Sequence, residues 1–270
     1  MREASLQELQ SVQAGLLRRF AGWCGENGLR VFLAYGTLLG AARHGGFIPW
    51  DDDTDVWMLR EDYERMLEME APAGTFFVRE TDPDSIWCFT KLCAEGTFFD
   101  ETALNGLSPK RYGIYVDIFP LDCAASPGAA KRKSLLCRLL VRAFLFGHVT
   151  YASASRTLPM RIARRLLHFI CGLASKQGYA KAIRRCSMSG RTGGAWRLVA
   201  SELEFQAFDG AHFSGAERLT FEGAEFDAPL RHEDLLAQLY GDTWRTPIKR
   251  KADTHGKAYV QDGFCLDQAK

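Results

Sequence analysis

Apolar side chains recur at helical spacing near the start of the chain. The positions are Leu6, Leu9, Val12, Leu16, Leu17 and Phe20. A repeat every three or four residues is typical of an amphipathic helix with one buried face, and Gly28 can end such a helix. The pattern therefore predicts a helix over residues 5–27.

Shorter apolar runs follow, separated by glycine, proline and polar residues. Apolar runs of about four to eight residues between turn signals indicate strands, whereas a 3.6-residue period indicates helices. The predicted strands cover 30–35, 56–59 and 219–222, with others near 76–80, 86–92, 97–101 and 112–119. The predicted helices are a short one after a turn at 36–40, then 61–70, a region over roughly 129–190, and 232–240, before a polar tail. This mixture predicts an α/β or α+β domain interrupted by a helical lobe.

Charge is distributed unevenly along the chain, although the formal net charge is only +1. Between Cys123 and Ser201 there is no Asp or Glu, and this stretch carries 15 of the 34 Lys and Arg residues. Such asymmetry indicates a basic surface that faces an anionic partner. We therefore expect a catalytic domain over 1–122 and 202–270 and a basic helical lobe over 123–201.

Two segments of this lobe combine basic residues with an apolar body, 131–147 and 158–174. Neither contains the roughly 18 apolar residues that a membrane span requires. Basic amphipathic helices bind anionic membrane surfaces, so we predict contact with a lipid-linked acceptor or peripheral contact with a membrane. A lobe whose basic face is simply solvated is the alternative. Nucleic acid is not a predicted partner, because aromatic residues are not interleaved with the basic ones.

The first residues, 1–5, contain no apolar signal region, so no secretory leader is predicted. The eight cysteines are scattered and lack the spacing of a zinc site. We therefore expect reduced thiols and a cytoplasmic protein, peripheral at the inner face of the cell membrane.

An acidic cluster, Asp51-Asp52-Asp53-Thr54-Asp55, lies between apolar flanks. Four carboxylates in five positions repel one another, and hard divalent cations prefer such oxygen ligands. In an extended chain, Asp51, Asp53 and Asp55 would share one face and Asp52 would lie on the other. An EF-hand is excluded by Val56 at its sixth position. A solvated acidic turn and the Asp-x-Asp of a metal-dependent glycosyltransferase remain open.

A second acid lies in a strongly apolar context. Asp117 is the one acid in the predicted strand 112–120. A buried carboxylate needs a partner. The alternatives are an ion pair, with Arg111 as the nearest candidate, or a third metal ligand beside Asp53 and Asp55.

Four motifs together resemble the LicD family of phosphocholine transferases, whose wider group includes fukutin and fukutin-related protein. They are Tyr35–His44, Gly46–Asp55 followed by Asp62-Tyr63, Tyr115–Asp122 and Tyr240–Trp244. The resemblance runs from about residue 30 to 245. It implies an α+β fold with a nucleotidyltransferase-like mixed sheet, flanking helices and, here, the inserted basic lobe.

The resemblance also assigns roles to particular residues. Asp53, Asp55 and Asp117 match the acids that hold a divalent metal, Mg²⁺ or Mn²⁺. Gly36 and Thr37 match the turn that holds donor phosphates. We count Asp51, a further acid of the motif, among the catalytic candidates, because either Asp51 or Asp117 can accept the proton of the acceptor hydroxyl.

Further donor contacts are predicted from side-chain chemistry. Arg43 can clamp a phosphate with two hydrogen bonds, and Lys91, isolated in a predicted strand, can point into the same cleft. Aromatic faces attract a quaternary ammonium such as choline. The aromatic candidates are Trp50, Trp57, Tyr63, Trp87 and Trp244.

The resemblance implies a metal-dependent transfer of phosphocholine from CDP-choline to a hydroxyl of a cell-surface glycan precursor, of the lipopolysaccharide or teichoic-acid type. Three alternatives remain: transfer of another phospho-alcohol, such as ribitol phosphate from its CDP donor; a metal-dependent glycosyltransferase; and a non-catalytic binding module.

Overall fold

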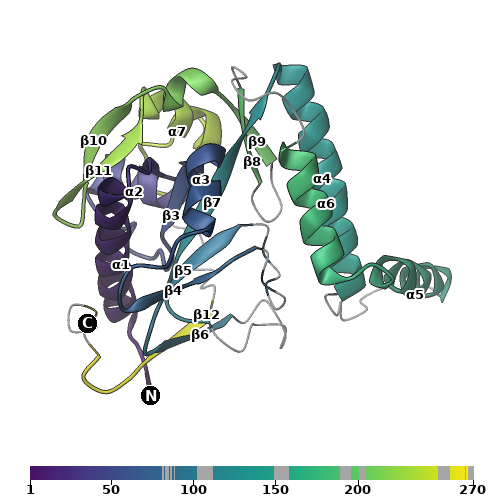
Figure 1. Ribbon diagram of the computed structural model, residues 1–270, viewed down its shortest axis with the longest axis horizontal. Helices are drawn as coiled ribbons and strands as arrows, with labels where there is room; N and C mark the ends of the chain where they lie inside the picture. The colour runs from purple at the N-terminus through teal and green to yellow at the C-terminus, as the bar shows by residue number, and fades with distance from the viewer. Residues whose placement is uncertain are drawn as a thin grey trace.

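The computed structural model describes residues 1–80, 82, 85, 87, 89–101, 112–148, 158–188, 196–200, 205–248, 256–264 and 266. The predicted α+β class with a mixed sheet is confirmed (Figure 1). The central sheet has the order β2-β3-β7-β5-β4, and β8 pairs with β7 and β9 with β8. These strands are β2 (Val31–Leu33), β3 (Asp55–Leu59), β4 (Thr75–Val78), β5 (Thr90–Ala94), β7 (Tyr115–Ala124), β8 (Trp196–Ala200) and β9 (Phe205–Asp209).

The pairing directions explain why two distant acids become neighbours. Strands β3 and β7 are parallel, whereas β5 runs antiparallel to β7. Asp55 is the register partner of Asp117, and Asp117 is in turn the partner of Lys91. The sheet therefore places two carboxylates and one ammonium group side by side on three adjacent strands.

Helices cover this sheet and supply the apolar core. Helix α1 (Leu6–Glu26) begins with a capping box between Ser5 and Glu8 and packs against β5 and β7. The sequence forms this helix because most of its apolar positions, among them Leu9, Leu16 and Phe20, fall on the buried side. Three shorter helices are α2 (Tyr35–His44), α3 (Arg60–Leu67) and α7 (His232–Tyr240). Helix α2 packs on β3 and α7, and α3 packs on β3 and β7.

Two smaller β-structures complete this part of the chain. The hairpin of β10 (Ala216–Phe221) and β11 (Ala224–Pro229) packs on α2 and β2, after a 3₁₀ turn η2 (Gly210–Phe213). A separate antiparallel sheet joins β1 (Arg2–Glu3), β12 (Gly256–Val260) and β6 (Thr97–Glu101). In this sheet, β12 near the end of the chain pairs both with β1 near its start and with β6.

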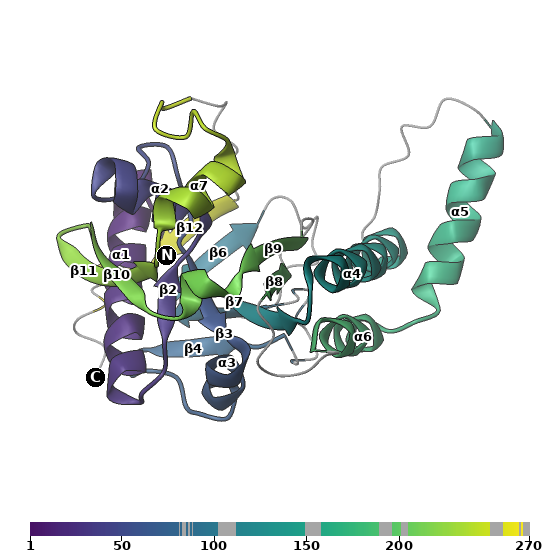
Figure 2. The same cartoon turned by 90° about the horizontal axis from the view of Figure 1, so that it is seen from above.

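Three helices form a lobe beside the sheet, α4 (Pro127–His148), α5 (Leu158–Gly172) and α6 (Lys176–Met188). Helices α4 and α6 share a small core of Cys137, Val141 and Ile183. Helix α5 extends away from the body of the molecule in both views (Figures 1 and 2). Within the described ranges, no helix combines the length and apolarity needed to cross a membrane.

The predicted elements match the structure best where one face is consistently apolar, as in α1 and α7. The prediction missed β11, the second strand of a hairpin that turns at Glu222 and Gly223, both with positive φ. The polar tail contains β12. Strand β8 lies within the predicted lobe 123–201 yet pairs with β7, so the main sheet reaches into that range.

Buried charges connect the lobe to the sheet. Arg60 donates from Nε and Nη2 to the two carboxylate oxygens of Asp122 at 2.8 and 2.9 Å, and lies 3.8 Å from Glu80. Arg184 of α6 pairs with Glu80 and with Glu64 of α3. Burial lowers the pKa of Arg60, but Asp122 and Glu80 outweigh it, so Arg60 stays charged.

We predict that Arg60→Met lowers the unfolding free energy by about 3–5 kcal/mol, because Asp122 and Glu80 would remain buried without this cation. Urea unfolding measures the loss. The matched control is Arg218→Met, which removes an exposed pair with Asp227 and should cost no more than about 1 kcal/mol. Equal losses in the two variants would contradict the prediction.

Candidate active site where strands β3 and β7 meet

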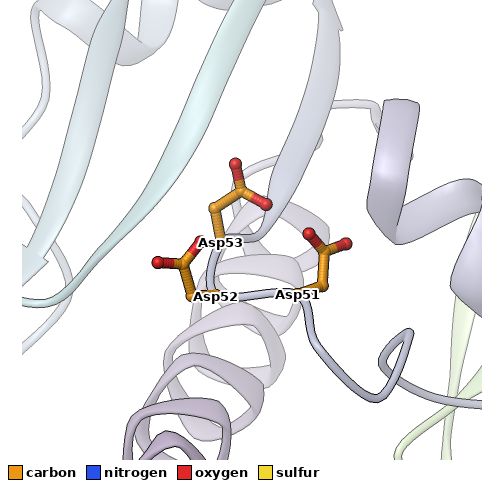
Figure 3. Close-up of side chains that lie close together, drawn as sticks. All are labelled: Asp51, Asp52 and Asp53. Carbon is orange, nitrogen blue, oxygen red and sulfur yellow. The ribbon is translucent and has the colours of Figure 1, made fainter. Parts of the chain in front are cut away.

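The acidic cluster forms a loop that leads into β3. Residues 51–54 are not in a strand, and β3 starts at Asp55. The alternation expected of an extended chain is therefore wrong here. Asp51, Asp52 and Asp53 each bring a carboxylate oxygen within 4.8 Å of the others (Figure 3). Asp52 thus belongs to the same cluster, although sequence reasoning placed it on the opposite face.

Two glutamines of α1 hold this loop by its backbone. Gln10 donates to the carbonyl of Asp51 and Gln13 to that of Asp52, both at 2.9 Å. Gln13 is fully buried. Sequence reasoning missed both residues, but a glutamine between Leu9 and Leu16 on the apolar face of a helix was the available signal.

Helix α2 holds the other side of the loop. Gly36 and Thr37 lie in the first turn of α2 rather than in a turn before it. The buried hydroxyl of Thr37 accepts the backbone N–H of Asp55 at 2.8 Å. A Cβ at Gly36 would lie 2.8 Å from Oδ2 of Asp51. Glycine at this position therefore lets the acidic loop approach the start of the helix.

The third predicted acid, Asp117, has an ionic partner. The Nζ of Lys91 lies 2.7 Å from Oδ1 and 2.9 Å from Oδ2 of Asp117. Lys91 is 1% exposed, and its Nζ lies 3.6 Å from the ring centroid of Tyr115 and 4.8 Å from that of Trp87. The partner is thus Lys91, whereas the suggested Arg111 lies outside the described residues. A direct contact of Lys91 with donor phosphate stays a prediction.

The carboxylates act on one another electrostatically. Burial raises the pKa of Asp55 well above its ordinary value, and the charges of Asp53, Asp117 and Asp51 raise it further, while Lys91 opposes them. A bound cation relieves this repulsion. The ligands are all carboxylate oxygens, which is the chemistry that Mg²⁺ and Mn²⁺ prefer. The residues present therefore fit the implied metal.

A pocket of about 180 Å³ lies between α2, the residues just before the acidic loop, and the end of α7 with the segment that follows it. It is lined by Leu39, Arg43, Ile48, Trp50, Tyr240, Thr243, Trp244, Thr246 and Ile248. The structure thus brings three predicted residues together, Arg43, Trp50 and Trp244. Sequence reasoning missed Tyr240, although it begins the quoted motif Tyr240–Trp244. Trp50 directly precedes Asp51 in the chain, so this pocket lies beside the acidic loop.

The other aromatic candidates lie elsewhere. Trp57 is fully buried and packs on Tyr35 and Phe208, and Tyr63 is fully buried with its hydroxyl 2.8 Å from that of Thr90. Their burial in the core removes them from the set of ligand-contacting candidates. The Trp87 ring already faces the ammonium group of Lys91.

We predict that Thr37→Val lowers the unfolding free energy by about 1–3 kcal/mol, because the buried N–H of Asp55 loses its acceptor. Thr37→Ser keeps the hydroxyl and loses only a methyl group, so it should cost roughly 1 kcal/mol or less. Chemical denaturation of both variants checks this, and a serine variant as unstable as the valine variant would refute the anchoring role.

Comparisons with known proteins find a related domain and related transferases. Residues 28–130 match the model of the LicD/FKTN/FKRP nucleotidyltransferase domain. The chain is 26% identical to the lipopolysaccharide cholinephosphotransferase LicD of Haemophilus influenzae, over 98% of this chain and 100% of the relative. It is 38% identical to ribitol 5-phosphate transferase FKRP of Mus musculus and of Homo sapiens, over 27% of this chain and 14% of each relative. Residues 28–130 are therefore similar to a LicD-type nucleotidyltransferase domain, and almost the whole chain is similar to a LicD cholinephosphotransferase.

Proposed function

We propose that this protein transfers phosphocholine from CDP-choline to a hydroxyl of a cell-surface glycan precursor of the lipopolysaccharide or teichoic-acid type, with the help of a divalent cation. The observation that carries the proposal is the cluster of carboxylates beside an aromatic pocket that also contains an arginine. The name of the full-length relative from Haemophilus influenzae supports the choice of phosphocholine.

The metal ligands in this proposal are Asp53, Asp55 and Asp117, with Asp51 and Asp52 close to Asp53. When bound, Mg²⁺ or Mn²⁺ would neutralise charge on the donor pyrophosphate and make CMP a better leaving group. The ammonium group of Lys91 compensates the negative charge of Asp117 in its buried position.

The chain's own residues position the two substrates. The guanidinium of Arg43 lies at the pocket wall and donates to the carbonyl of Trp244 at 2.9 Å, which leaves further N–H groups for a donor phosphate. The acceptor oxygen attacks the phosphorus bonded to choline, and the bond from that phosphorus to CMP breaks. Either Asp51 or Asp117 takes the acceptor proton. Catalysis of this kind depends mainly on positioning and charge compensation.

The choline group fits the pocket lined by Trp50, Tyr240 and Trp244. A quaternary ammonium is attracted by aromatic faces and by the nearby negative charges of the acidic loop. Arg43 would repel the ammonium group, so we place it on the phosphate side of the pocket.

The proposed place of action is the cytoplasmic, inner face of the cell membrane, where the protein acts as a peripheral protein on a lipid-linked glycan. The basic stretch from Cys123 to Ser201 supports this location, because it carries 15 Lys and Arg residues and no acid.

The decisive experiment measures release of CMP or UDP from CDP-choline, CDP-ribitol, CDP-glycerol and a UDP-sugar, with cell-envelope extract as acceptor. We expect CMP from CDP-choline only, loss of release in EDTA with recovery on adding Mg²⁺, and a drop of at least about 100-fold in Asp53→Asn. The matched control Asp227→Asn, on the exposed hairpin, should retain full activity.

Other outcomes of this experiment select the alternatives. Release of CMP from CDP-ribitol would support the same transfer chemistry with a different donor substrate. UDP release alone would make the protein a glycosyltransferase. If no donor reacts, calorimetric titration of CDP-choline with Mg²⁺ decides: binding without turnover would indicate a non-catalytic module.

The aromatic pocket makes a separate prediction. Trp50→Leu should raise KM for CDP-choline about 2–30-fold, as expected for loss of a cation–π contact of about 0.5–2 kcal/mol, and should leave kcat within about twofold. Trp50→Phe keeps an aromatic face and should behave almost as the wild type. Steady-state kinetics with varied donor provide the measurement, and a fall in kcat without a change in KM would argue against a choline-binding role.

A further inference from the structure

Exposed apolar side chains are concentrated on the helical lobe. Among the described residues, ten of the 14 large hydrophobic side chains that are exposed belong to α4, α5, α6 or the residue after α5. They are Leu135, Leu136, Leu139, Ile162, Leu166, Leu167, Phe169, Ile170, Leu173 and Met188. Such residues are normally scattered singly over a protein surface, so a concentration of this kind marks an interaction site.

Helix α5 presents its apolar residues on a side that its neighbours leave uncovered. Ile162, Leu166, Phe169 and Ile170 are 53–65% exposed and recur at helical spacing. The contacts that join α5 to α4 involve other positions: the ring of His168 lies 2.7 Å from the carbonyl of Phe146, and Cys171 is buried. The apolar side of α5 therefore faces away from its junction with α4.

Helix α4 adds apolar and cationic side chains. Leu135, Leu136 and Leu139 are 54–58% exposed. The exposed cations of the same helix are Lys131, Arg132, Arg138 and Arg142. The lobe contains no carboxylate, because no Asp or Glu occurs between Cys123 and Ser201. Exposed apolar residues flanked by cations have the chemistry of a helix that lies in the interface of an anionic membrane.

We propose that the exposed apolar residues of α4 and α5 enter the boundary between headgroups and acyl chains of an anionic lipid bilayer, while the neighbouring Lys and Arg side chains bind lipid phosphates. The helices lie on the membrane, since none of those described is suited to span it. This inference goes beyond the proposed transfer: it identifies the surface that docks, and it holds for the chain without donor or metal.

Charge complementarity favours lipid over a second copy of the chain. A symmetric dimer through this surface would oppose two lobes that carry many cations and no acid, so like charges would repel each other. The remainder of the chain carries 19 basic and 33 acidic residues and is therefore repelled by an anionic surface. The first repulsion disfavours a dimer through the lobe, and the second orients the lobe toward the membrane.

The test is co-sedimentation of the full chain with vesicles of phosphatidylcholine alone and with phosphatidylglycerol added. We expect binding to the anionic vesicles at low salt, at least about tenfold stronger than to neutral ones. The double variant Leu166→Gln, Phe169→Gln should bind at least about tenfold more weakly. The double variant Arg138→Gln, Arg142→Gln should lose about fivefold per cation at low salt and little at high salt.

The matched control is Leu6→Gln with Arg18→Gln, an exposed apolar and an exposed basic residue of α1, and it should bind like the wild type. All variants change exposed side chains, and their thermal unfolding is measured to confirm folding. CMP release from CDP-choline with a water-soluble acceptor should be unchanged in every variant, so failure of the proposed transfer and failure of the docking surface give different results.

Three results would overturn the proposal. The first is equal binding to neutral and anionic vesicles, or no binding to either at low salt. The second is a dimer on size-exclusion chromatography that Leu166→Gln with Phe169→Gln converts to monomer, because the surface would then bind a second copy. The third is retention of duplex DNA in a gel-shift assay at salt concentrations that release anionic vesicles.

Discussion

Repulsion among carboxylates is the constraint on which the rest of this structure depends. Asp51, Asp52 and Asp53 lie within a few ångströms of one another, and Asp55 is the register partner of Asp117 on the next strand. Left alone, such a group would push the loop apart or take up protons, as the raised pKa of Asp55 indicates. The surrounding elements act against both outcomes.

Three sets of interactions hold the acidic residues in place without neutralising all of their charges. Gln10 and Gln13 fix the loop through its carbonyl groups, and Thr37 fixes the N–H of Asp55. These bonds involve the backbone atoms of the acidic residues and not their carboxylates. The ammonium group of Lys91 balances one charge, that of Asp117. The remaining negative charge is what a bound cation would compensate in the proposed transfer, at carboxylates that the fold already holds together.

How well the sequence predicts an interaction depends on how far apart its residues lie along the chain. Helices α1 and α7 are specified by residues close together in the chain, and the sequence predicted them well. The sequence also located the acidic loop, but it did not predict that Asp52 lies in the same cluster as Asp51 and Asp53. The ion pair of Lys91 with Asp117 depends on the antiparallel register of β5 with β7, which is a long-range property. The core positions of Trp57 and Tyr63 likewise follow from the packing of several elements. A run of apolar residues predicts the helix or strand to which an aromatic residue belongs. It does not predict whether the aromatic ring lines a pocket or fills the core.

The uneven distribution of charge connects the active site to the lobe. Both the proposed donor pyrophosphate and the proposed anionic lipid surface carry negative charge, so the acid-rich part of the chain would repel both. At the donor site, a cation held by the carboxylates and the guanidinium of Arg43 would compensate for this repulsion over a few ångströms. At the membrane, only fixed cations at the protein surface can do so, because screening in salt limits attraction to roughly 10 Å. Because 123–201 contains no Asp or Glu, its cations have no acidic partner within that stretch, and exposed ones such as Arg138 and Arg142 can act on an external anionic surface.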